Sequence, residues 1–190
     1  MRVSEVRYAR LFNFPGRYEN ERIEVVIQLA EGEDPRAAWT KAYGLVHLLH
    51  ETGEALRLFS EIHEEAWSRV RSLGEQIRDA EADIGRYTAE YEKWKARLEE
   101  EEREQGRVSR RTLCELGHAE QLLEEAKKRL AELKQKRDWY EKMAHRAYEL
   151  KEELDKAIQD MDFDKVQEFL AGPIAEFMEA WHKGPSEEKG

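Results

Sequence analysis

The sequence has a single cysteine, Cys114, and contains no run of 18 apolar residues. One cysteine cannot form a disulfide within the chain, and a lone thiol suits a reducing compartment. Without the apolar run there is no candidate for a membrane-spanning helix, and the opening residues MRVSEVRYARLF lack the apolar core of a secretion signal. We therefore expect no membrane association and a location in the cytoplasm.

Recognisable catalytic motifs are also missing. The sequence has no glycine-rich phosphate loop, nucleophile elbow, Cys-x-x-Cys pair or paired-acid signature. Two Glu-x-x-His pairs, Glu115 with His118 and Glu179 with His182, have the spacing of helical di-iron ligands. Such spacings arise by chance in a chain rich in glutamate, so we expect neither an enzyme nor a metal or other cofactor.

Charged residues, by contrast, make up 39% of the chain. The 42 Asp and Glu outnumber the 32 Lys and Arg, and the net charge of −10 opposes indiscriminate binding to nucleic acid or to anionic membranes. Because so much charge leaves little apolar surface to bury, we expect an extended fold with a thin apolar seam.

In the middle of the chain, apolar residues recur at alternating spacings of three and four, as in a coiled-coil helix. The pattern runs from Leu56 to Leu98 and again from Leu116 to Ala157. If the two helices fold back on each other, residues whose numbers sum to 213 or 214 face each other, and large side chains meet small ones. The predicted pairs are Trp94 with Ala119, Tyr87 with Ala126, Ala80 with Leu133, and Leu98 with Leu116.

This mirror pattern predicts one antiparallel helical hairpin over residues 54–160. Its turn is expected near Gln105 to Ser109, where Gly106 is the only glycine between Gly85 and Gly117. The fold class is therefore mainly α, with a long antiparallel coiled-coil hairpin as its largest part.

Two strands are predicted near the N-terminus, where apolar and polar residues alternate. One face of this ribbon carries Val6, Tyr8, Phe12, Ile23, Val25, Ile27 and Leu29. A lone two-stranded ribbon is marginally stable in water, so its apolar face needs a cover. The nearest cover is the helix that Asp34 and Pro35 begin, as N-cap and first helical residue.

We therefore expect residues 1–53 to form a head of ribbon and first helix, with a bend at Gly53. The alternative is one helix from Pro35 to about Glu104, since an interior glycine costs only about 1 kcal/mol. Residues 161–183 are expected to form short amphipathic helices that pack on the head, followed by a disordered tail over 184–190.

Part of the N-terminal region resembles a known kind of module. The stretch FNFPGRYENERIEV at 12–25, followed by EGEDP at 31–35, is similar to small uncharacterised proteins, often phage-encoded, in which an N-x-x-G-x-Y-E ribbon precedes an E-G-E-D-P helix start. The similarity covers about residues 3–50; Pro15 and the long hairpin depart from the pattern. It implies a phage or mobile-element setting, the host cytoplasm, and an accessory role, and it assigns no catalytic residues.

Two basic groups are candidate interaction sites. One surrounds the expected turn, where a single acid accompanies Arg103, Arg107, Arg110 and Arg111. The other lies on the ribbon and consists of Arg10, Arg17, Tyr18 and Arg22. Arginine pairs well with phosphates and with acidic protein surfaces.

We favour a non-catalytic coiled-coil interaction or scaffold protein that forms homo-oligomers, because strands with open edges commonly pair across a dimer axis. Two alternatives stay open. One is a nucleic-acid-binding accessory factor that uses the ribbon and the arginines at the turn, and the other is an acidic inhibitor of a host nucleic-acid-binding enzyme. The net charge favours a protein partner over nucleic acid.

Overall fold

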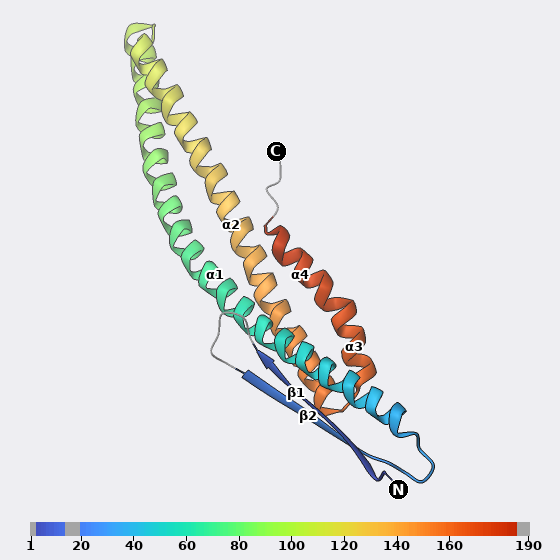
Figure 1. The fold of residues 1–190 in the computed structure, drawn as a ribbon. Helices are drawn as coiled ribbons and strands as arrows, with labels where there is room; N and C mark the ends of the chain where they lie inside the picture. Colours follow the sequence, from blue (N-terminus) through green and yellow to red (C-terminus); the bar gives the residue numbers. More distant parts are fainter. Residues whose placement is uncertain (1–2, 14–19, 186–190) are drawn as a thin grey trace. The chain divides into compact units, whose positions relative to one another are not determined.

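The computed structural model describes residues 3–13 and 20–185 (Figure 1). In chain order the elements are β1 (Glu5–Asn13), β2 (Asn20–Gln28), α1 (Pro35–Gln105), α2 (Arg110–Gln159), α3 (Phe163–Ala171) and α4 (Pro173–Lys183). The predicted fold class is confirmed: the chain is mainly α-helical, with a small N-terminal β-ribbon, two long helices that pack together and short C-terminal helices.

The chain divides into two compact units. The ribbon unit contains the described residues up to His63 together with His145–Gly184, and the hairpin unit contains Glu64–Ala144 together with Pro185. Helices α1 and α2 each contribute residues to both units.

Helix α1 continues through Gly53 without interruption. We expected a bend there, and the physical reason for continuity is packing on either side of the glycine. Thr52 and Ala55 are both buried, and the packing of their neighbourhood outweighs the small helix penalty of one glycine.

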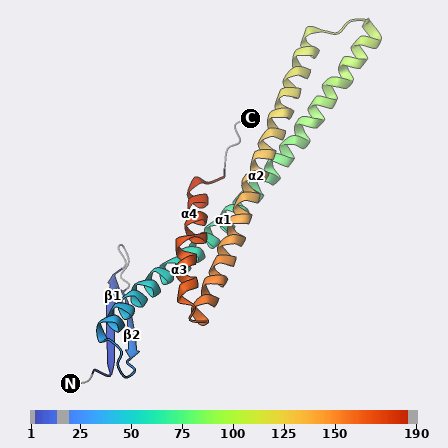
Figure 2. The same ribbon diagram turned by 90° about the vertical axis from the view of Figure 1, so that its right-hand side faces the viewer.

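In the ribbon unit, β1 and β2 pair antiparallel, with Tyr8 opposite Val25 and Phe12 opposite Glu21. The inner face of this ribbon lies on the first turns of α1 (Figure 2). Phe12 stacks on His50 with 3.7 Å between the ring centroids. Helix α1 is therefore the cover that the ribbon needs.

The core of the ribbon unit contains side chains from several helices. Its largest fully buried apolar side chains are Val46 and Phe59 from α1, Leu150 and Leu154 from α2, and Val166 from α3. Helix α4 adds Phe177, whose ring centroid lies 5.7 Å from that of Phe59. The amphipathic C-terminal helices thus bury their apolar faces within this unit.

The hairpin unit has the thin seam that the spacing of apolar residues predicts. Ala80 and Leu133 belong to one buried cluster, which is completed by Leu73 and Ile77. Across the seam, Lys134 Nζ lies 3.0 Å from Oε1 of Glu81. A large leucine against a small alanine lets the helices approach closely.

Candidate interaction surfaces

The turn of the hairpin consists of residues 106–109, between the end of α1 and the start of α2. Gly106 has a φ of 61° and donates its N–H to the carbonyl of Glu102 at 3.0 Å. This left-handed conformation after a helix end suits glycine, which has no Cβ to clash.

One carboxylate, that of Glu101, ties the two sides of the turn together. It accepts hydrogen bonds from the backbone N–H of Ser109 and from Thr112 Oγ1, both at 2.8 Å. Arg97 Nε approaches the same carboxylate at 3.3 Å. These hydrogen bonds favour the ionised form of Glu101 and lower its pKa to about 2. The bond from the backbone N–H of Ser109 has the largest effect.

These hydrogen-bonding residues were not predicted from the sequence, although the seam pattern contains their signal. Glu101 follows Leu98 by three positions and Thr112 precedes Leu116 by four, so both continue the apolar repeat. Their numbers also sum to 213, the register of the predicted pairs. A polar pair at seam positions therefore closes the hairpin, and Thr112 is almost completely buried.

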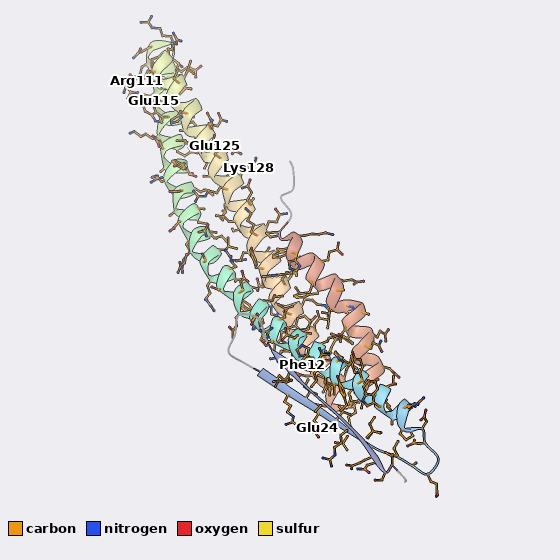
Figure 3. All side chains as sticks on the ribbon, in the orientation of Figure 1. Phe12, Glu24, Arg111, Glu115, Glu125 and Lys128 are labelled. Carbon is orange, nitrogen blue, oxygen red and sulfur yellow. The ribbon has the colours of Figure 1, made fainter. Side chains whose placement is uncertain are left out.

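The predicted basic group at this turn is present and exposed. Within the described part of the chain, no hydrogen bond or ion pair is found for the side chains of Arg103, Arg107, Arg110 and Arg111. We call these four residues the arginine turn; Arg111 is labelled in Figure 3.

The position of two of these arginines is unfavourable for the helix itself. Arg110 and Arg111 occupy the first turn of α2, which contains no acid. A helix N-terminus carries partial positive charge, so a cation there costs about 0.3–1 kcal/mol. Folding alone does not explain their placement.

The structure does not bring the predicted ribbon residues together. Arg10 lies on the inner face of the ribbon, opposite Ile23, whereas Arg22 lies on the outer face, opposite Leu11. Arg22 approaches Glu24 at 3.4 Å. Arg17 and Tyr18 lie outside the described residues.

Arg10 contributes to a different group of side chains, which was not predicted from the sequence. Its Nη1 lies 2.9 Å from Nε2 of His47. Because a guanidinium has no acceptor, Arg10 donates and His47 Nε2 accepts, in its unprotonated form. The guanidinium also lies over the ring of Phe12, 5.3 Å from the centroid.

Around this contact, rings from β1 and α1 form a continuous series, which we call the aromatic row: Tyr8, Phe12, Trp39, Tyr43, His47 and His50. Trp39, Tyr43 and His47 are each four positions apart on α1 and so share one helix face. That spacing was visible in the sequence, but the contribution of Tyr8 and Phe12 depends on how the ribbon docks. Phe12 is labelled in Figure 3.

The ribbon unit also has an open groove of about 850 Å³ beside α1 and α3. Its apolar lining includes Leu45, Leu48 and Phe163, and its polar lining includes Lys41 and Asp164. Met161, in the turn between α2 and α3, also lines the groove and is 73% exposed.

No metal centre is found among the residues that the structure describes, because no three His, Cys, Asp or Glu side chains are grouped to hold one. Glu115 and His118 lie on α2, whereas Glu179 and His182 lie on α4. Cys114 is an exposed free thiol on α2. In the same described part of the chain, no helix is both long and apolar enough to cross a membrane.

Comparison with models of protein families, with curated proteins and with solved structures found no match. The similarity of the N-terminal module to small phage-encoded proteins therefore stays a prediction, and residues 14–19 of its motif lie outside the described residues.

Proposed function

We propose that this chain is a non-catalytic interaction protein that associates with a second copy of itself through the edges of its ribbon. The main support is the size of the sheet, which has only two strands among the described residues. Each strand therefore has one edge whose backbone N–H and C=O groups have no strand partner, and such edges pair readily. Two ribbons joined in this way form a four-stranded sheet.

The outer face of the ribbon supports the same proposal. Leu11 is 57% exposed and Val26 is half-exposed. Both lie on the face that α1 does not cover, in register with Arg22 and Arg7 respectively. Apolar side chains beside an open strand edge favour burial against a partner.

The experiment measures molecular mass by light scattering. The wild type is expected to form a species of at least twice the 22.5 kDa chain mass. Replacing Leu11→Lys and Val26→Lys should return it to a monomer, because lysines at a strand edge oppose pairing. The inner face is unchanged, so helical content should be retained.

A matched control is Leu113→Lys, which changes a leucine of similar exposure on α2 in the hairpin unit. This variant should keep the mass of the wild type. A wild type that stays monomeric at high micromolar concentration would reject self-association.

A nucleic-acid-binding accessory role is the second candidate, and the arginine turn favours it. These side chains have no acidic partner in the described structure, and two of them sit where α2 disfavours cations. Phosphates or an acidic surface would supply the missing negative charge.

Replacing Arg107, Arg110 and Arg111 by serine tests this role. The melting temperature should not fall, because the three side chains are exposed and make no ion pair in the described structure. If the turn binds double-stranded nucleic acid, the slope of log affinity against log salt should decrease by about 2 to 3. No binding by the wild type at low salt would exclude this candidate.

A further inference from the structure

The aromatic row has an unusually exposed end. Trp39 is 49% exposed and Tyr43 is 40% exposed, although large rings are usually well buried. Their centroids are 5.6 Å apart and their planes differ by 27°, so the two rings stack on each other. Each ring still leaves a large part of its surface open to solvent.

The rings of Trp39 and Tyr43 are packed against other aromatic side chains of the row. Tyr8 meets Trp39 edge-on, with 5.8 Å between centroids, and lies 5.3 Å from Tyr43. His47 supports Tyr43 from the next helical turn at 4.4 Å. Rings fixed by their neighbours lose little conformational freedom when a ligand stacks on them.

Positive charge without a counter-ion lies beside these rings. The Arg10 guanidinium contacts His47 Nε2 at 2.9 Å, and no ion pair with a carboxylate is found for it among the described residues. Arg36 precedes Trp39 by three positions on α1 and is exposed, and the structure gives its side chain no ion pair among the described residues. By contrast, the ribbon arginines Arg7 and Arg22 each approach a glutamate.

We propose that the exposed end of the aromatic row binds single-stranded nucleic acid: bases stack on Trp39 and Tyr43, and phosphates pair with Arg10 and Arg36. Protein surfaces that bind single-stranded nucleic acid combine two elements: aromatic rings on which bases stack and positive charges that pair with phosphates. The site would bind with little sequence preference, because every base has a face on which an aromatic ring can stack. This inference is independent of self-association and assigns a ligand to a separate surface.

The surroundings favour nucleic acid over an apolar protein partner. Arg36 and Thr40 flank the rings on α1, and both are exposed. The strongly exposed aliphatic side chains of the ribbon, Leu11 and Val26, lie on its other face. A partner with an apolar surface would thus meet polar neighbours around the rings, whereas a sugar–phosphate chain is complementary to them.

The test measures binding of the full-length protein to a fluorescent oligothymidylate at low salt, by anisotropy. The wild type should bind this single strand more tightly than a duplex. A chain of abasic sugar phosphates with the same charge should bind far more weakly, because it has no bases to stack.

Variants locate the site. Trp39→Ala and Tyr43→Ala should each weaken binding by about fivefold to a hundredfold, the range expected when one stacked base is lost. Arg10→Gln and Arg36→Gln should each reduce the salt slope by about 0.7. Tyr148→Ala is the matched control, since this tyrosine is 50% exposed in the same unit and bonds instead to Glu152; it should bind as the wild type does.

Several results would overturn the proposal. These are no binding to the oligothymidylate at low salt, equal affinity for the abasic chain, or wild-type affinity in both ring variants. Loss of binding in the arginine-turn variant alone would place the site elsewhere. A change of molecular mass in Trp39→Ala, without an effect on nucleic acid, would assign the rings to an interface between copies.

Discussion

Glu101 shows how one side chain can determine the geometry of the turn. Its carboxylate replaces water as the acceptor for Ser109 N–H and Thr112 Oγ1, at the start of α2. The ionised carboxylate also supplies negative charge at the N-terminus of α2, whose first turn contains two arginines and no acid. The acid therefore offsets part of the unfavourable placement of Arg110 and Arg111.

The lowered pKa of Glu101 predicts acid sensitivity of the hairpin. A carboxyl whose pKa falls from 4.5 to about 2 on folding stabilises the fold above pH 4.5. That contribution is lost as the pH falls towards 2. Glu101→Gln should therefore lower the melting temperature at neutral pH, and its difference from the wild type should shrink over this pH window.

The control for this experiment is Glu100→Gln, one position away. Glu100 is exposed, and none of the described interactions involves it. Its melting temperature should follow that of the wild type at every pH. A carboxyl titration of Glu101 near 4.5 by NMR would contradict the assigned role.

At the scale of the elements, the hairpin depends on register. Ala80 and Leu133 share a buried cluster, and Tyr87 and Ala126 line the same small groove. Because residues three or four positions apart lie on the same helix face, the Glu101–Thr112 hydrogen bond places Leu98 and Leu116 opposite each other one turn further along.

A disulfide tests this register. With Cys114→Ser, the pair Leu98→Cys and Leu116→Cys should cross-link within one chain at any dilution, which gel mobility under non-reducing conditions will show. Moving one cysteine to the exposed neighbour Glu99→Cys should slow the reaction strongly, because that position points away from the seam. Cross-links only between chains would mean that the helices pair across an oligomer.

At the scale of the whole molecule, the net charge of −10 acts on every association. Two copies repel each other through this charge, and salt screens the repulsion. Binding to nucleic acid through arginines has the opposite dependence, because salt competes with counter-ion release.

The two proposed interactions should therefore respond oppositely to ionic strength. Raising salt from about 10 mM to about 150 mM, where the screening length falls from about 30 Å to about 8 Å, should increase the dimer fraction in light scattering. The same change should weaken oligothymidylate binding. Dissociation of the dimer by salt would show that ion pairs, rather than backbone and apolar contacts, hold it together.

The amino-acid sequence by itself determined the helical content, the two strands and the pairing of the hairpin seam. The strand faces and helix stripes depend on spacings within a few residues: alternation defines a strand face, and the repeat of three and four defines a helix stripe. The seam pairing adds only the symmetry of two such stripes about one turn. The same repeat contained Glu101 and Thr112, so this part of the turn was predictable in principle.

Only the tertiary structure decided the continuity of α1 at Gly53 and the composition of the aromatic row. The first depends on how Thr52 and Ala55 pack, which outweighs a glycine penalty of about 1 kcal/mol. The second depends on docking of the ribbon, which brings Tyr8 against Trp39 across a long separation in sequence. The spacing within the ribbon and within α1 does not show which faces of the two elements meet, because that contact arises only when separate elements bury their apolar faces against each other. The hairpin differs, because its two stripes mirror each other about one turn.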